Sequence, residues 1–225
     1  RAAVQACVNA CHRAHSLDQV LAIVDGAFPN RERDADDKAD WHYLTAMMRA
    51  LAVPALDPYI GLLVDQDDAP GLRALFTTWI TAPQPQLDNL IPAVLEGAVA
   101  YIRSGAKDFA PEARAVLELG ERYPGDAGVL AALLLNRISL KAGEGIFLPA
   151  GNLHSYLQGM AMEVMANSDN VLRGGLTPKH VDVPELLRVL DFTPVVDARV
   201  GTRRDGIEVV YETPAAEFAG SELIV

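Results

Sequence analysis

The chain has 225 residues, of which 50% are hydrophobic and 22% charged, and its formal net charge is −11 at pH 7. This length and composition are typical of a globular protein with one large domain or two smaller ones. The negative charge and the absence of a basic stripe argue against a nucleic-acid partner, because phosphate-backbone binding depends on clustered Lys and Arg.

Membrane insertion and secretion are also disfavoured by the sequence. The longest apolar run, residues 128–135, is much shorter than the roughly 20 residues of a membrane-spanning helix. No secretory leader is recognisable, and the two cysteines do not resemble a disulfide framework. We therefore expect a cytoplasmic protein without a membrane partner. The ends of the sequence, Arg1 and a strand-like run up to Val225, suggest a fragment of a longer protein.

The first part of the chain has apolar residues at the three- and four-residue spacing of helices. Capping residues and prolines support several helix starts, such as Ser16 and Asp57-Pro58. The sequence predicts helices over 2–15, 16–28, 41–51, 71–80, 87–103 and 111–123, and one that starts at 57–58. Pro124-Gly125 is a turn signal. Residues 1–130 are therefore predicted to form a helical domain.

After about Asn136 the apolar pattern changes to the two-residue period of strands. The predicted strands cover 138–140, 146–148, 153–158, 162–166, 206–211 and 217–225, with turns near 143–145 and Gly159 and a short helix over 184–190. Alternation places His154 and Tyr156 on the same strand face. Residues 131–225 are predicted to form a β domain, so the fold class is α+β.

His154 and Glu163 are the first candidates for chemistry. His154 follows a turn and begins a strand, where its imidazole would be able to bind zinc through one ring nitrogen. One histidine does not make a metal site, however, and the residues alone favour a core histidine bonded to a backbone carbonyl. Glu163 is most simply exposed. The alternative is a carboxylate inside a barrel, where burial raises the pKa and permits proton transfer.

Arg173 and Lys179 lie in a loop interrupted by Gly and Pro. Together they would be able to neutralise a phosphate or a developing oxyanion. Two cations in a loop more often form a solvated surface, but the flanking glycines permit close backbone approach and lysine is scarce in this chain. Asp169 and Asn170 are most simply turn formers.

The N-terminal segment contains the other cluster of metal-ligand types. Cys7, Cys11 and His15 would share one face of a helix, and His12 lies beside them. Their spacing matches no common zinc motif, and small cysteines on a helix face usually pack in a core. We expect packing rather than metal binding here, and the role of the cluster is left open.

Two stretches carry a resemblance to a known family. GEGIFLPAGNLHSYLQG (143–159) and EVMANSDNVLRGGLTPKHVDVPELL (163–187) resemble the signature region of type I mannose-6-phosphate isomerases. LRALFTTWI (72–80) and ERYPGDAGVLAALLLNRISLKAGE (121–144) are similar to the same family. The resemblance covers roughly residues 46–215, and it is specific because the match is contiguous.

The resemblance implies a zinc-dependent aldose–ketose isomerase built on cupin (jelly-roll) domains with a helical domain. Such an enzyme interconverts mannose 6-phosphate and fructose 6-phosphate through an enediol, in mannose metabolism and GDP-mannose biosynthesis. It implies that the present chain covers the helical domain and part of a cupin domain. The site residues that it implies are His154 as a zinc ligand, Arg173, Lys179 and Glu163 as catalytic residues, and Tyr156 and Asp169 as substrate-binding residues.

The sequence departs from the family at the other zinc ligands. The family takes them from a Gln-x-His pair and a glutamate in an N-terminal cupin segment, and no Gln-x-His occurs here. We therefore expect the isolated chain to be inactive. Two alternatives remain: a non-catalytic relative that binds a sugar phosphate, and a protein-interaction module built on the helical region. Zinc content and oligomerisation would separate these possibilities, and the sequence indicates no oligomeric state.

Overall fold

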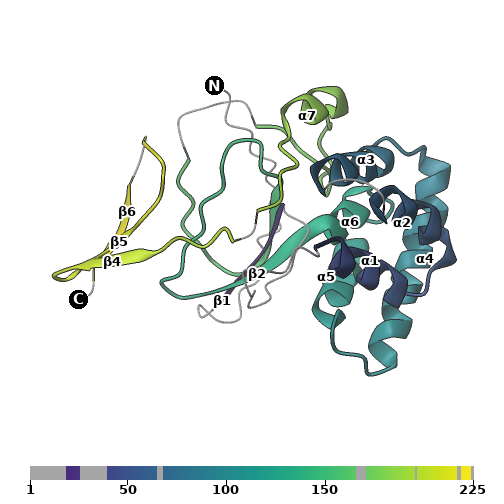
Figure 1. Cartoon of the computed structure of the whole chain (residues 1–225), viewed down its shortest axis with the longest axis horizontal. Coiled ribbons are helices and arrows are strands. Elements are labelled where there is room, and N and C mark those ends of the chain that lie inside the picture. The colour runs from purple at the N-terminus through teal and green to yellow at the C-terminus, as the bar shows by residue number, and fades with distance from the viewer. Residues whose placement is uncertain are drawn as a thin grey trace.

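The computed structural model describes residues 19–25, 40–64, 68–165, 171–195, 197–216 and 219–223. Its helices are α1 (Asp40–Ala50), α2 (Asp57–Val64), α3 (Asp68–Ile80), α4 (Gln84–Arg103), α5 (Ala110–Arg122), α6 (Gly128–Ala131) and α7 (Val183–Val189), with two 3-10 helices at Pro54–Leu56 and Ala132–Leu134. Its strands are β1 (Gln19–Asp25), β2 (Leu135–Lys141), β3 (His154–Gln158), β4 (Thr202–Asp205), β5 (Glu208–Tyr211) and β6 (Gly220–Leu223). Helices α1–α6 gather at one end of the molecule and β4–β6 at the other (Figure 1).

The helical end is built on the spacing that the sequence predicts. Helix α4, for example, buries its apolar residues at three- and four-residue intervals, and a proline lies in its first turn. The predicted helices over 41–51, 71–80, 87–103 and 111–123, and the helix starting at 57–58, are confirmed within a few residues. Trp79 and Phe76 of α3 are among the largest fully buried side chains.

The first sheet has the order β2-β1-β3, and both pairings are antiparallel. Its central strand, β1, contradicts the predicted helix over 16–28, because residues 19–25 form a strand. A short apolar run rich in Val and Ile suits either structure by its pattern, and here the neighbours β2 and β3 decide it. The predicted helix over 2–15 lies outside the described residues.

The second sheet is the antiparallel meander β4-β5-β6. All four residues of β4 are exposed and all four of β5 are half-buried. The sequence did not indicate β4, whereas β5 and β6 fall inside predicted strands. The predicted strand over 162–166 is wrong for 162–165, which are exposed and pair with no described strand. Of the predicted strand 146–148, the structure has a single bridge between Ile146 and Arg199.

One continuous core joins the helices to the β region. Leu153 and Leu157 of the β3 segment, Leu176 of the following loop and Leu186 of α7 are buried in the same apolar cluster as the helical residues. The α+β class is confirmed, and the partial sheets are consistent with an incomplete jelly roll. The division at residues 130 and 131 stays a prediction. No helix in the described ranges is both long and apolar enough to span a membrane.

Candidate functional site

His154 begins β3 and is buried, with 6% of its surface exposed. Its Nδ1 lies 3.1 Å from the carbonyl oxygen of Asn152. The preceding loop is fixed by Gly151, whose φ of +89° suits glycine and whose carbonyl accepts a hydrogen bond from Asp191 N at 3.0 Å, just after α7. The ring is therefore oriented through Nδ1 by a loop whose backbone is itself held against the end of α7.

The other ring nitrogen of His154 fits a metal ligand. Nε2 is buried and has no hydrogen-bond partner among the described residues. If Nδ1–H donates to the Asn152 carbonyl, Nε2 carries the lone pair, which is the arrangement in which histidine binds zinc. No group of three or more His, Cys, Asp and Glu in the described ranges is placed to hold a metal ion. The described residues therefore do not supply the three or more ligands that a zinc site needs, and His154 Nε2 is the donor that fits best among them.

Tyr156 and Glu163 lie beside this histidine. The Tyr156 hydroxyl donates to Glu163 Oε1 at 3.1 Å, and the same oxygen is 3.9 Å from His154 Nε2. The rings of His154 and Tyr156 meet edge to face with centroids 5.8 Å apart, so the predicted shared face is confirmed. The Glu163 side chain is 34% exposed. Three predicted site residues thus meet at one carboxylate oxygen.

The predicted cationic loop is anchored close to this strand. Gly174 lies against Leu153, because a Cβ on Gly174 would come within 2.6 Å of Leu153 Cδ1. Arg173 directly precedes Gly174 and His154 directly follows Leu153. The two predicted site residues therefore belong to segments that are in contact. Arg173 is half-buried and Lys179 is exposed. Asp169 and Asn170 lie outside the described residues, as do Cys7, Cys11, His12 and His15.

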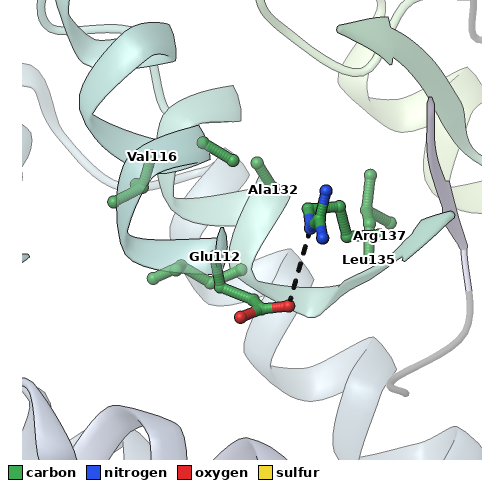
Figure 2. Close-up of a pocket in the computed structure, with 7 residues that line it drawn as sticks. Glu112, Val116, Ala132, Leu135 and Arg137 are labelled. Atoms are coloured by element: carbon green, nitrogen blue, oxygen red, sulfur yellow. Dashed lines mark ion pairs between the residues drawn. The ribbon is translucent and has the colours of Figure 1, made fainter. Parts of the chain in front are cut away.

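A separate pocket lies between α5 and β2. Figure 2 shows Glu112 and Arg137 facing each other beside Val116, Ala132 and Leu135. Arg137 Nε is 3.9 Å from Glu112 Oε1. Burial raises the pKa of Glu112 above its ordinary value, although hydrogen bonding and the Arg137 charge lower it in part. The pocket contains none of the predicted site residues, and we interpret this pair as a contact between the helices and the sheet.

Sequence reasoning missed two groups that orient the site. The first is the carbonyl of Asn152, because a backbone oxygen gives no residue-type signal. The second is Asp126, whose carboxylate contacts the loop that follows Arg173. Asp126 directly follows the Pro124-Gly125 turn, and an aspartate beside a turn gives no signal of a contact 51 residues away.

Comparison with known proteins finds mannose-6-phosphate isomerases. No family model matches the chain. The mannose-6-phosphate isomerase of Escherichia coli is 37% identical over 172 residues, which is 75% of this chain and 42% of that protein. The human mannose-6-phosphate isomerase is 51% identical over 108 residues, 46% of this chain and 26% of that protein. The chain is related to the mannose-6-phosphate isomerases.

Solved structures of mannose-6-phosphate isomerase have the same fold over most of this chain. The Salmonella typhimurium enzyme bound to fructose 6-phosphate and zinc superposes with a TM-score of 0.72 at 30% identity, over 92% of this chain and 48% of that one. Its apo form gives a TM-score of 0.70 at 31% identity, with the same coverage. The chain thus spans less than half the length of the mannose-6-phosphate isomerases that it matches here.

Proposed function

We propose that this chain forms the helical part and a portion of the β region of a zinc-dependent isomerase that interconverts mannose 6-phosphate and fructose 6-phosphate. The curated relatives carry the name of that enzyme, and a structural neighbour contains zinc and fructose 6-phosphate. The single observation that carries the proposal is His154 Nε2, which is buried, has no hydrogen-bond partner among the described residues and lies beside Tyr156 and Glu163.

Each residue of this chain has a stated task in the proposal. When bound, zinc supplies Lewis-acid polarisation of the sugar's oxygens. His154 Nε2 holds the metal, and the Asn152 carbonyl keeps the ring in the matching tautomer. Glu163, kept in place by the Tyr156 hydroxyl, accepts or delivers the proton that moves between C1 and C2. Arg173 stabilises the negative charge of the enediolate or holds the phosphate.

Glu163 and Arg173 gain support from the spacing of variants studied in the Salmonella enzyme. Two solved structures of that enzyme, each 29% identical to this chain, have alanine in place of a glutamate and of an arginine at positions ten residues apart. Glu163 and Arg173 are also ten residues apart. The common spacing supports the assignment of both residues to the site.

Three further residues, Lys179, Tyr156 and Asp169, complete the proposed site. Lys179 is the second candidate for the anionic partner, since it follows Arg173 in the same loop. Tyr156 and Asp169 are proposed to contact the sugar phosphate. Enzymes of this activity provide fructose 6-phosphate or mannose 6-phosphate to sugar metabolism, including GDP-mannose biosynthesis, and we propose a cytoplasmic location on the basis of the resemblance.

A graft tests the catalytic assignment. Residues 46–215 would replace the matching segment of the E. coli enzyme, which supplies the remainder of the protein. We expect the graft to bind zinc and to isomerise mannose 6-phosphate. His154→Ala should abolish bound zinc by elemental analysis, and Arg173→Ala should lower kcat by about 10²–10³-fold, the usual effect of removing one charge-stabilising donor. A folded, zinc-loaded graft without isomerase activity would overturn the proposal.

A matched arginine serves as the control. Arg188 is exposed and its ion pair is with Glu185 of the same helix, so Arg188→Ala should leave kcat unchanged. The isolated chain should show no turnover, because the described residues contain no group of three or more ligands placed to hold a metal ion. If the isolated chain bound mannose 6-phosphate equally well with and without zinc, the non-catalytic sugar-phosphate-binding alternative would be favoured.

A further inference from the structure

Asp126 joins two parts of the chain that lie far apart in sequence. It precedes α6, and its Oδ1 accepts a hydrogen bond from Gly128 N at 2.7 Å. Its Oδ2 lies 3.4 Å from Thr177 N, 51 residues further along the chain. The first contact is a local Asx turn, which many aspartates make. The second contact belongs to the loop that carries Arg173.

The backbone of this loop touches the start of α6 without room for a side chain. A Cβ on Gly175 would come within 2.8 Å of Asp126 Oδ1 and 2.9 Å of Gly128 Cα. A Cβ on Gly128 would come within 2.8 Å of Leu176 N. Gly175 has φ +109°, and the next residue, Leu176, has φ +53° although it is not glycine. The close approach therefore requires both glycines and a strained leucine.

The same loop also contacts the residue that directly precedes β3. Gly174 contacts Leu153, the residue before His154, and Leu176 is buried with 5% of its surface exposed. The segment from Gly174 to Thr177 is thus held between the Asp126 carboxylate and β3. Any shift of the loop away from Asp126 would also change where Arg173 lies relative to His154.

We propose that Asp126 is a positioning residue, whose carboxylate fixes the Arg173 loop against the strand that begins at His154. The effect of Asp126 on catalysis rests on the function proposed above for Arg173. The holding of the loop by Asp126 does not depend on that function. Both carboxylate oxygens are used, one for the turn and one for the distant loop. Asparagine at this position has one side-chain oxygen and can serve only one of the two donors.

Hydrogen exchange tests whether Asp126 holds the loop. In the 225-residue chain, Asp126→Ala should accelerate amide exchange in a peptide covering 171–180 by about tenfold, because the loop opens more readily. Peptides from α4 should be unchanged. Asp197→Ala is the matched control, because Asp197 Oδ1 also accepts from the amide two residues on, that of Arg199, and its ion pair is with the same arginine. Unchanged exchange over 171–180 in Asp126→Ala would overturn the holding role.

Steady-state kinetics test whether Asp126 affects catalysis through the position of Arg173. In the E. coli graft, Asp126→Asn should lower kcat by about tenfold or more, since small displacements of a catalytic group have effects of this order. The double variant with Arg173→Ala should lose no more than Arg173→Ala alone, because both changes act through one residue. Independent, multiplicative losses would overturn the positioning role.

The two proposals fail differently. An inactive graft with Asp126 in place contradicts the proposed isomerase function, and the exchange experiment then still decides whether Asp126 holds the loop. An active graft whose kcat is unaffected by Asp126→Asn contradicts the positioning role and leaves the isomerase function standing.

Discussion

The helical end and the outer sheet of this molecule differ sharply in how they are packed. Helices α1–α6 share one core in which Trp79, Leu75 and Val94 have no exposed surface. The sheet β4-β5-β6 has no buried residue in its first two strands. A second apolar cluster, which involves β2, contains only three buried residues among those described: Ile138, Leu140 and Ala198. Most of the stabilising apolar burial therefore lies in the helices.

The candidate site lies in neither of these two regions but on β3 of the first sheet, which packs against the helical core. Leu153 and Leu157 alternate with His154 and Tyr156 in and beside β3, and both leucines are buried in the helical core. A strand fixed by this core presents its polar side chains with little freedom. The difference between the regions indicates that the helices hold the site and that the outer sheet contributes little to its rigidity.

The largest expected effect comes from the helical core. Trp79 is fully buried and its ring lies 5.7 Å from that of Tyr59. Trp79→Ala should lower the free energy of unfolding by about 3–5 kcal/mol, because it leaves a large cavity. Denaturant titration followed by circular dichroism measures this. Val210→Ala, in the half-buried β5, should cost about 1 kcal/mol or less; an equal cost at both positions would contradict the comparison.

The next effect is where the Arg173 loop meets the start of α6. Gly175→Ala should cost about 2–4 kcal/mol, from unfavourable backbone geometry at φ +109° and from overlap with Asp126 and Gly128. Thermal unfolding measures it. Gly206→Ala is the control, since Gly206 has φ +64° and nothing within 4 Å, so its cost of about 1–2 kcal/mol reports the backbone term alone. Equal decreases of the melting temperature in the two variants would show that the overlap of the new Cβ with Asp126 and Gly128 adds no cost.

A smaller effect is expected at α7, which supports the His154 loop. Asp182 caps this helix by accepting a hydrogen bond from Glu185 N at 3.1 Å. Asp182→Ala should cost about 1 kcal/mol, the usual value of an N-cap. Asp88→Ala removes an exposed aspartate whose Oδ1 accepts a hydrogen bond from Gln84 Nε2 of the same helix, and it should cost less than about 0.5 kcal/mol. Chemical denaturation of the two variants side by side distinguishes these values.

The smallest effect is a pH dependence at the contact between α5 and β2. Burial raises the pKa of Glu112 above its ordinary value of 4.5. A raised pKa means that the folded protein binds the proton more tightly, so the contribution of Glu112 is complete below pH 4.5 and is lost as pH rises through the folded pKa. Relative to Glu112→Gln, the wild-type chain should therefore lose stability over that window.

Glu185 provides the opposite sign in the same measurement. Its pKa is lowered by the hydrogen bond and the charge of Arg188, so its contribution is present above pH 4.5 and is lost as pH falls. Glu185→Gln and Glu112→Gln should therefore change the pH dependence of the unfolding free energy in opposite directions. A common direction would contradict the assignment of burial as the cause at Glu112.

The sequence pattern predicted α3–α5 and α7 and, within the first sheet, β2 and β3, but it predicted a helix where the central strand β1 lies. Helices α3–α5 followed from local spacing, since a helix is stabilised by residues three and four apart. Strand β1 could not be recognised, because its pairing partners β2 and β3 follow much later in the chain. The strand predicted over 162–166 failed over 162–165 for the converse reason: the pattern was present without a described neighbour.

The sequence predicted the residues of the candidate site and one shared strand face, but not the contacts between its segments. Alternation placed His154 and Tyr156 on one face, and their edge-to-face contact confirms this. The approach of Glu163 to both depends on how the chain turns after Gly159, whose φ is +119°. The contact between Asp126 and the Arg173 loop spans 51 residues, and no local pattern reports a contact of that range.

The central position of β1 has a consequence for how the chain folds. Asp25 is paired with Leu135, so 110 residues must be bridged before the sheet can close. The entropic cost of closing a flexible loop rises with its length, but here α1–α6 occupy most of the intervening chain and shorten the effective loop once they form. We therefore expect the helices to fold first and the sheet to be the slow step, detectable as helical circular dichroism that recovers before protection of the β1 amides.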